Sequence, residues 1–414
     1  NAADAEEVNK LVRDQVEAQR KTDHERIERE IKMRTREAQS AIDKIAELKA
    51  RIGNDRWDDL NADDIAQAVK IVRKSGVLGT YDGVSSVRNS LRAALLGAGW
   101  PVTIPGLTID RKCGSGEVAV HVGAGLIAAG SAEVVVAGGA ENMSRVRMGG
   151  NREIYGEAFG WLAAERYELT SQGEAAERVA EHWNLTREAL DAFAVRSHQK
   201  AAAAAEAGYF TREIAPVPVN DLKDRDWAEP TVALFSADET IRPGTAAAKL
   251  ATLKSSFRPE GRLTAGNSSQ ISDGAAVLLL MSEAAVTRLG VTPKARIRAF
   301  TTVGSDPTLM LTGPIAATRR VLAQAGLSLA DIDLYEVNEA FAPVPLMWQQ
   351  ELGADLEKLN VNGGAIALGH PLGASGARIM TSLLYELARR GGRYGLQAIC
   401  CAGGMGTATI IERL

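Results

Sequence analysis

The sequence predicts an α/β protein in which helices cover mainly parallel sheets and two similar halves follow one another along the chain. Short apolar runs such as 133–137 end in glycine turns and alternate with longer helical patterns such as 118–129. This alternation is typical of strands joined by crossover helices. The last third repeats it, with one candidate helix and three candidate strands at 376–389, 334–337, 397–400 and 407–412. We therefore expect a duplicated α/β unit with loops from both halves facing each other.

Residues 1–74 form a charged region with a different texture. Up to residue 52, acidic and basic residues alternate, and large apolar residues recur at spacings near three and four. This pattern predicts one or two long surface helices held by ion pairs, with a coiled coil as an open alternative. A further short amphipathic helix is expected at 61–72. The result is an atypical charged helical N-terminus.

The elements of the first half follow from about residue 76. A short strand at 105–109 leads to Cys113 and the helix 118–129, and buried strands are expected at 133–137 and 275–281. The segment 146–264 differs, because two helical patterns at 173–183 and 187–207 precede a proline-rich stretch. We expect an inserted loop domain there. The predicted division is 1–74, a first half at 75–283 and a second half at 284–414.

Composition and charge exclude several classes of protein. A net charge of −4 over 414 residues gives no reason to expect nucleic acid as a partner. No run approaches the 18 apolar residues of a membrane span. Gly123 and Gly125 lie inside a predicted helix, which argues against a dinucleotide fingerprint, and no cysteine–histidine cluster has zinc spacing. Three cysteines form no disulfide framework, so we expect a reducing, cytoplasmic location and no bound metal.

All three cysteines lie in glycine-rich segments, which indicates thiol chemistry. Cys113 follows a candidate strand and opens a helix, whereas Cys400 and Cys401 precede a glycine turn. A helix dipole and free N–H groups lower the pKa of a cysteine at such a place. A buried structural cysteine at a tight junction fits the same pattern, and this alternative stays open.

Two further segments carry polar residues suited to catalysis. His370 lies in the segment GHPLGASG (369–376), where proline and glycine would pin a base near a thiol. Asn338 and Glu339 begin the segment NEAFA (338–342), where Asn338 could position a water or an oxyanion and Glu339 a neighbour. Cys400 could shuttle a proton as a second thiol.

Together these motifs resemble the thiolase family, the acyl-CoA C-acetyltransferases, from about Ser75 to Leu414. The resemblance also includes TAGNSS (264–269), ISDGAA (271–276) and GGAENMS (138–144). It implies the thiolase-like fold of duplicated five-stranded sheets in α/β/α/β/α layers. It also implies CoA-dependent thiolytic cleavage of 3-ketoacyl-CoA, or the reverse Claisen condensation, through an acyl-cysteine.

The resemblance assigns roles to individual residues. It implies that Cys113 carries the acyl group, that His370 activates this thiol, and that Cys400 exchanges a proton with acetyl-CoA. Asn338 would hold a water that, with His370, stabilises the enolate oxygen. The N–H groups of Cys113 and Ala402 would form a second oxyanion hole. Residues lining the acyl and pantetheine pocket would be Ser269, Ala340 and Phe341.

The resemblance further implies acyl-CoA and CoA as substrates, no metal or redox cofactor, and a homodimer or homotetramer. Three departures stand out. The strand with an Arg-Thr-Pro segment that begins most thiolases is missing, Ala402 replaces a glycine, and Ser171-Gln172-Gly173 stands where the family often has His-Met-Gly. Two alternatives follow: a ketoacyl-ACP synthase, disfavoured by Asn338 and Cys400, and a catalytically impaired thiolase-like structural or lipid-binding subunit.

Overall fold

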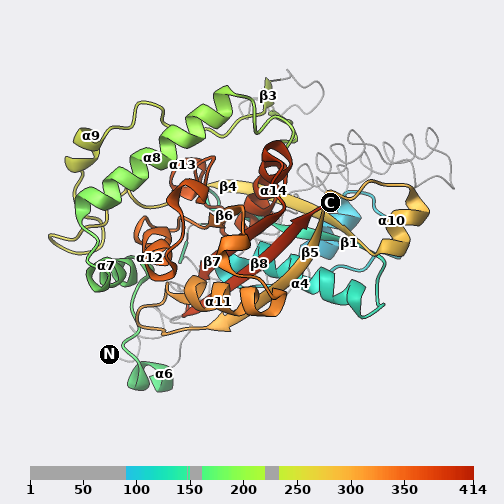
Figure 1. Ribbon diagram of the computed structural model, residues 1–414, viewed down its shortest axis with the longest axis horizontal. Coiled ribbons are helices and arrows are strands. Elements are labelled where there is room, and N and C mark those ends of the chain that lie inside the picture. Colours follow the sequence, from blue (N-terminus) through green and yellow to red (C-terminus); the bar gives the residue numbers. More distant parts are fainter. Residues whose placement is uncertain (1–89, 147, 150–160, 220–232) are drawn as a thin grey trace, which may run out of the picture. The chain divides into compact units, whose positions relative to one another are not determined.

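The computed structural model describes residues 90–146, 148–149, 161–219 and 233–414 (Figure 1). The helices predicted within 1–74 lie outside these ranges. The chain divides into two compact units, one of 1–77 and 93–105 and one of 78–92 and 106–414. In the first unit the described residues comprise most of α3 (Ser90–Gly97) and a turn closed by Ile104 N–H on Pro101 O at 3.0 Å. Every other described element belongs to the second unit.

A four-stranded sheet lies at the centre of the second unit, in the order β5-β8-β7-β6. Its strands are β5 (Ala295–Gly304), β6 (Leu334–Val337), β7 (Tyr394–Cys401) and β8 (Met405–Arg413). β6 and β7 run parallel, and the other neighbours are antiparallel. The three strands predicted for the last third are therefore confirmed. The expectation of mainly parallel sheets, however, is wrong for the described strands, because most of them pair with neighbours that run in the opposite direction.

Helices cover both faces of this sheet. Ile410 packs in one apolar cluster with α11 (Gly313–Ala325), whereas the next residue, Ile411, packs in another with α14 (Leu372–Arg390). Successive strand residues point to opposite faces, so α11 and α14 lie on opposite sides. α4 (Ser115–Ala128) shares the side of α14, since His121 of α4 contacts Thr409 of β8.

A second sheet covers the other side of α4 and α14. It pairs β1 (Val134–Asn142) with β4 (Asp273–Met281) in antiparallel register. Val120, Ala137 and Met380 form the small core between these helices and this sheet. The order of layers within the described ranges is thus helix, sheet, helices, sheet (Figure 1).

The sequence predicted β1 and β4 as buried strands, and this was wrong for one face. Alternate side chains of both strands are exposed, at 40–53 % of their surface: Val134, Val136, Val277 and Leu279. The intervening side chains Val135, Ala137, Leu278 and Leu280 pack with Met380 of α14, so the strands alternate between packed and exposed positions.

The strand predicted at 105–109 is also wrong. Residues 105–109 form no strand, and the segment lies against the start of α3. Leu91 N–H donates to Thr108 Oγ1 at 3.4 Å, and a Cβ at Gly106 would lie 2.7 Å from Arg92 N. Within the described ranges the two α/β sheets have two and four strands, fewer than the five predicted for each.

The segment between β1 and β4 supplies a helical layer of its own. The helices predicted at 173–183 and 187–207 are confirmed as α7 (Gln172–His182) and α8 (Arg187–Glu206). Ser171 and Thr186 cap them by accepting the N–H groups of Glu174 and Ala189, both at 3.2 Å. The same segment contains α6 (Trp161–Arg166), β2 (Val217–Val219), β3 (Ala233–Phe235) and α9 (Ala247–Ala251). The predicted domain boundaries stay predictions.

The remaining elements are short. They are the helices α10 (Glu283–Leu289), α12 (Pro343–Leu352) and α13 (Ala365–Leu368) and the 3₁₀ turns η3 (Lys112–Gly114), η4 (Leu329–Asp331) and η5 (Leu356–Lys358). None of the described helices combines the length and the apolar character needed to cross a bilayer.

Candidate active site

Cys113 lies in the turn η3, directly before α4, and its side chain is buried. The preceding residue, Lys112, has a positive φ of 53°, which is a costly conformation for a residue with a Cβ. Asp110 supports it by accepting the Lys112 N–H at 2.8 Å. This left-handed residue lets the chain turn into the helix with the thiol inside the protein.

Three hydrogen-bond donors lie close enough to the Cys113 sulfur to lower the pKa of its thiol. They are the backbone N–H groups of Cys113 and Ala402 and the side chain of Gln172. Each of them lowers the pKa of the thiol, yet burial outweighs them and raises that pKa to about 11. The sequence-based expectation of a lowered pKa was therefore wrong, because it counted the donors and not the desolvation. The resting Cys113 is a thiol that needs a base.

This raised pKa predicts how Cys113 reacts with iodoacetamide. Only the thiolate reacts, so its rate of alkylation should rise about tenfold per pH unit from pH 7 to beyond pH 9. An ordinary thiol levels off near its pKa of about 8.5. Mass spectrometry of the peptide containing Cys113 over a pH series measures this rate. A plateau near pH 8.5 would contradict the burial argument.

His370 lies between a tight turn and the first residues of α14. Gly369 has φ 86°, and a Cβ there would lie 2.2 Å from Ser272 Oγ, so only glycine fits. The His370 N–H donates to Gln270 O at 3.1 Å and fixes the loop. Burial lowers the pKa of His370 to about 4, so the imidazole is neutral and able to accept a proton near pH 7.

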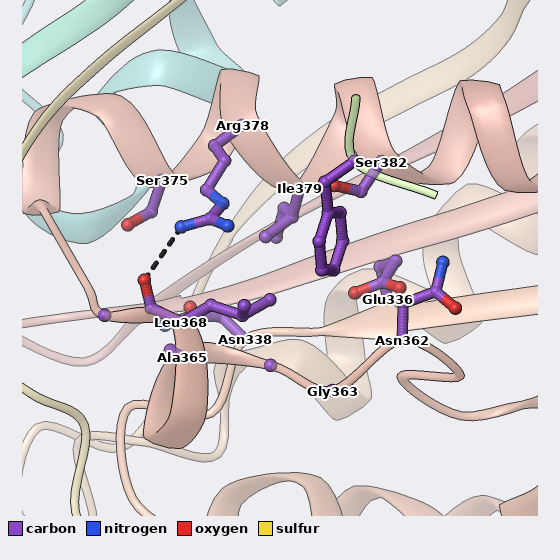
Figure 2. A pocket seen from close by; sticks show the side chains of 13 residues that line it. Glu336, Asn338, Asn362, Gly363, Ala365, Leu368, Ser375, Arg378, Ile379 and Ser382 are labelled. Atoms are coloured by element: carbon purple, nitrogen blue, oxygen red, sulfur yellow. Dashed lines mark hydrogen bonds between the residues drawn. The ribbon is translucent and has the colours of Figure 1, made fainter. Parts of the chain in front are cut away.

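The His370 ring has a polar neighbour at each nitrogen. Nδ1 lies 2.6 Å from Ser375 Oγ, and Nε2 lies 3.3 Å from Asn338 Nδ2. The Asn338 Oδ1 atom is buried and has no hydrogen-bond partner. Asn338 and Ser375 also line a small cavity beneath α14, together with Glu336 (Figure 2).

Glycines bring the segments of Cys113 and His370 together. A Cβ at Gly116 would lie 2.8 Å from Gly373 O, and a Cβ at Gly376 would lie 2.1 Å from Glu117 N. The N-terminal turns of α4 and α14 therefore pack backbone against backbone. Glu141 of β1 joins them by accepting the Gly373 N–H at 2.9 Å. The expectation that loops from both halves meet agrees with this packing.

Cys400 and Cys401 end β7 and are both buried. Burial, and secondarily the nearby Cys113, raise the pKa of Cys400. Burial and the nearby Cys113 also raise the pKa of Cys401, whose sulfur lies 2.6 Å from where a Cβ on Gly114 would lie. Cys400 therefore lies close enough to Cys113 for charge on one to affect the other, and it too is protonated at rest.

Glu339 holds the loops around the candidate base. Its buried carboxylate accepts from Ser197 Oγ at 2.6 Å, Asn360 Nδ2 at 2.9 Å and Ile366 N at 3.1 Å. These bonds tie α8, the NEAFA segment and α13 to one another. Asn338 lies in the NEAFA segment and His370 lies shortly after α13, so this carboxylate joins the two segments that carry them.

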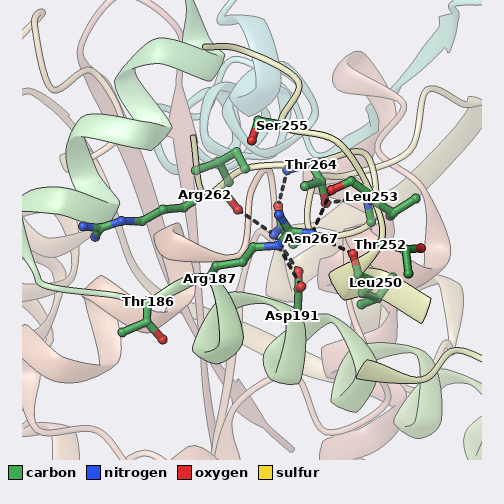
Figure 3. Close-up of polar contacts among 12 residues, drawn as sticks. Thr186, Arg187, Asp191, Leu250, Thr252, Leu253, Ser255, Arg262, Thr264 and Asn267 are labelled. Atoms are coloured by element: carbon green, nitrogen blue, oxygen red, sulfur yellow. Dashed lines mark hydrogen bonds and ion pairs between the residues drawn. The ribbon is translucent and has the colours of Figure 1, made fainter. Parts of the chain in front are cut away.

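The residues predicted to line the substrate pocket occupy one neighbourhood. Ser269 N–H donates to Ala340 O at 3.0 Å, and Phe341 packs edge-on against Phe257 at 5.6 Å. A polar network anchors the segment before Ser269 (Figure 3). In it, Asn267 Nδ2 donates to Asp191 Oδ1 at 2.8 Å, and Arg187 Nε lies 2.7 Å from Asp191 Oδ2.

Gln172 is a site residue whose role the sequence did not reveal. Its segment departs from the family pattern, and the fold brings its side chain close enough to lower the pKa of Cys113. Replacing Gln172 by methionine removes one donor from the thiolate. We expect alkylation of Cys113 at pH 8 and kcat both to fall about tenfold, as for loss of a hydrogen bond to a charged group.

Ser171→Ala provides the matched control for Gln172→Met. Ser171 caps α7 through Glu174 N at 3.2 Å. Its loss should lower the free energy of unfolding by about 1 kcal/mol without changing alkylation of Cys113. Wild-type alkylation in Gln172→Met would show that Gln172 does not act on the thiol.

Comparison with known proteins defines the class. Residues 37–284 match the family model "Thiolase, N-terminal domain", and residues 291–413 match "Thiolase, C-terminal domain". The first match begins at residue 37, inside the charged region 1–74. The chain belongs to the thiolase family.

Its relatives agree in sequence and in fold. The chain is 44 % identical to an acetyl-CoA acetyltransferase of Thiocystis violacea, over 82 % of this chain and 87 % of that one. It is 42 % identical to a 3-ketoacyl-CoA thiolase of Bacillus subtilis, over 88 % and 95 % of the two chains. The crystal structure of human mitochondrial 3-ketoacyl-CoA thiolase in complex with CoA matches with a TM-score of 0.71 and 36 % identity, covering 86 % and 93 %.

These findings confirm the thiolase fold class and a thiolase enzyme of the acyltransferase class. They do not favour the alternative of a catalytically impaired subunit.

Proposed function

We propose that this thiolase cleaves 3-ketoacyl-CoA with CoA, and condenses acyl-CoAs in the reverse direction, through an acyl group on Cys113. The observation that best supports this proposal is the set of groups that surround the Cys113 sulfur. Two backbone N–H groups and Gln172 lie close enough to lower the pKa of its thiol, and Cys400 lies near enough for Cys113 to raise the pKa of Cys400. The relatives named for acetyl-CoA acetyltransferase and 3-ketoacyl-CoA thiolase activity support both directions.

The first half-reaction transfers the acyl group to the enzyme. His370 Nε2 takes the proton of the Cys113 thiol, and the thiolate attacks the 3-keto carbon. The bond between C2 and C3 then breaks, and the acyl group stays on sulfur as a thioester. Cys400 gives its proton to the departing acetyl-CoA enolate, so that acetyl-CoA leaves neutral.

The second half-reaction returns the enzyme to its resting state. The Cys400 thiolate takes the proton of CoA, whose sulfur attacks the acyl carbon. The bond to Cys113 breaks, and Cys113 regains its proton from His370. One 3-ketoacyl-CoA and one CoA thus give acetyl-CoA and a shortened acyl-CoA.

Oxyanion stabilisation fits the same residues. The N–H groups of Cys113 and Ala402 would bind the oxygen of the tetrahedral intermediates, and Ala402 does not have the positive φ that would strain it. Asn338, through a water, and His370 would stabilise the enolate oxygen. Each such donor lowers a barrier by about 3 kcal/mol.

The remaining assignments concern substrates and assembly. Ser269, Ala340 and Phe341 would line the pocket for the acyl and pantetheine groups, and CoA enters as a substrate. A related crystal structure contains CoA, which supports this. We further propose a cytoplasmic homodimer or homotetramer that needs no metal or redox cofactor. Light scattering during size-exclusion chromatography measures the mass of the assembly, and a monomer would contradict this proposal.

The experiment that tests the reaction follows acetoacetyl-CoA and a longer 3-ketoacyl-CoA with and without CoA. Mass spectrometry should find two acetyl-CoA for each acetoacetyl-CoA, equal amounts of acetyl-CoA and a shortened acyl-CoA from the longer substrate, and an acyl group on the Cys113 peptide when CoA is omitted. Folded protein that leaves both substrates intact would refute the proposed function.

A further inference from the structure

Ser375 occupies a buried position one turn into α14 and contacts the candidate base. Its Oγ lies 2.9 Å from the Pro371 carbonyl oxygen and 2.6 Å from His370 Nδ1. A serine hydroxyl has one hydrogen and can direct it to only one of these atoms. Figure 2 shows Ser375 on α14 beside the segment that leads to His370.

The carbonyl decides where that hydrogen lies. A carbonyl oxygen cannot donate, so the 2.9 Å contact is attractive only when the Ser375 hydroxyl donates to it. Ser375 Oγ then has only lone pairs for His370, and the 2.6 Å contact requires a hydrogen on Nδ1. A neutral imidazole with Nδ1–H has its free lone pair on Nε2.

The opposite side of the ring gives the same result. Asn338 Nδ2 can only donate, and it lies 3.3 Å from His370 Nε2, which therefore must accept. Two contacts, one at each ring nitrogen, thus select the same tautomer. Unconstrained neutral histidine prefers the other one, with the hydrogen on Nε2.

We infer that Ser375 is a positioning residue that accepts the Nδ1–H of His370 and thereby keeps the lone pair on Nε2, the atom that takes the proton of Cys113. The inference rests on the proposed role of His370 as the base. Without the serine, the imidazole would favour the form whose Nε2 carries a hydrogen and cannot accept one. Ser375 also receives support from the Pro371 carbonyl, which belongs to the same GHPLGASG motif.

The tautomer can be measured directly, without turnover. Protein labelled with ¹⁵N-histidine gives distinct shifts for protonated and unprotonated ring nitrogens, and the His370 signals are those lost in His370→Gln. The wild-type enzyme should show Nδ1 protonated and Nε2 unprotonated at pH 7.5. An Nε2–H form in the wild type would overturn the inference, even if the enzyme cleaves 3-ketoacyl-CoA normally.

Two substitutions separate positioning from packing. Ser375→Thr retains the hydroxyl and adds one methyl group at a residue that lines the small cavity. We expect it to keep the tautomer and to keep kcat within about threefold. Ser375→Ala should shift His370 towards Nε2–H and lower kcat on the order of ten- to a hundredfold, part of what a general base contributes, with KM nearly unchanged.

Thermal unfolding of both variants controls for folding. A Ser375→Ala enzyme that loses activity while His370 keeps the Nδ1–H form would show a merely structural role and overturn the inference. An alanine variant with the wild-type tautomer and rate would overturn it as well. Failure of the wild-type enzyme to cleave 3-ketoacyl-CoA would instead refute the proposed function and leave the measured tautomer as it stands.

Discussion

Cys113→Ser should abolish thiolysis almost completely, with kcat falling on the order of a thousandfold or more. Serine keeps the volume of the side chain, but its hydroxyl ionises far less readily and gives a worse leaving group than a thiolate. A thousandfold corresponds to about 4 kcal/mol of lost transition-state stabilisation. Steady-state cleavage of acetoacetyl-CoA measures the change.

The adjacent thiol supplies the control for this substitution. Cys401 is as buried as Cys400, yet its sulfur faces Gly114 and the proposed mechanism does not use it. We expect Cys401→Ser to retain kcat within about fivefold and to keep the acyl group on Cys113. If Cys401→Ser were inactive and Cys113→Ser active, Cys113 would not be the nucleophile.

His370→Gln should lower kcat by about 10² to 10⁴, the usual contribution of a general base. Burial lowers the pKa of His370 to about 4, so the wild-type base stays unprotonated from pH 6 upward and its rate should change little up to pH 9. The variant depends on spontaneous ionisation of Cys113, whose pKa is raised to about 11 by burial. Its rate should therefore rise about tenfold per pH unit over the same range.

A second buried histidine serves as the matched control. Burial also lowers the pKa of His198 to about 4, and its Nδ1 accepts the Arg242 N–H at 3.2 Å. A glutamine at 198 can accept the same bond, so His198→Gln should lose little kcat and show the flat pH profile of the wild type. A flat profile in His370→Gln would mean that His370 is not the base.

Much of the candidate site could be predicted because its residues lie in short sequence motifs. Cysteine and histidine beside glycine turns imply a reactive loop, since only such turns let two helix N-termini approach through their backbones. The structure agrees, with Gly116 and Gly376 at the contact between α4 and α14. The strands β7 and β8 were also predicted from short runs of the sequence, and the structure buries most of their residues between covered faces.

Other features depended on groups that are distant in the sequence. A pattern cannot reveal how deeply a thiol is buried, so the direction of the Cys113 pKa shift was missed. The contact of Gln172 with that thiol joins segments some sixty residues apart. The strand expected at 105–109 did not form, and Leu91 at the start of α3 donates to Thr108 there, a contact that a local pattern cannot reveal.

The sequence by itself determined the family and the fold class, because several specific motifs occur in it in the order typical of the family. It also supplied the proposal that two thiols, a histidine and an asparagine carry the chemistry. Tertiary structure alone decided their electrostatic states. Desolvation keeps Cys113 protonated and His370 neutral, and it acts through every layer packed around them. Which ring nitrogen of His370 accepts the proton likewise depends on Ser375 and Asn338, whose distances to the ring exist only once the chain has folded.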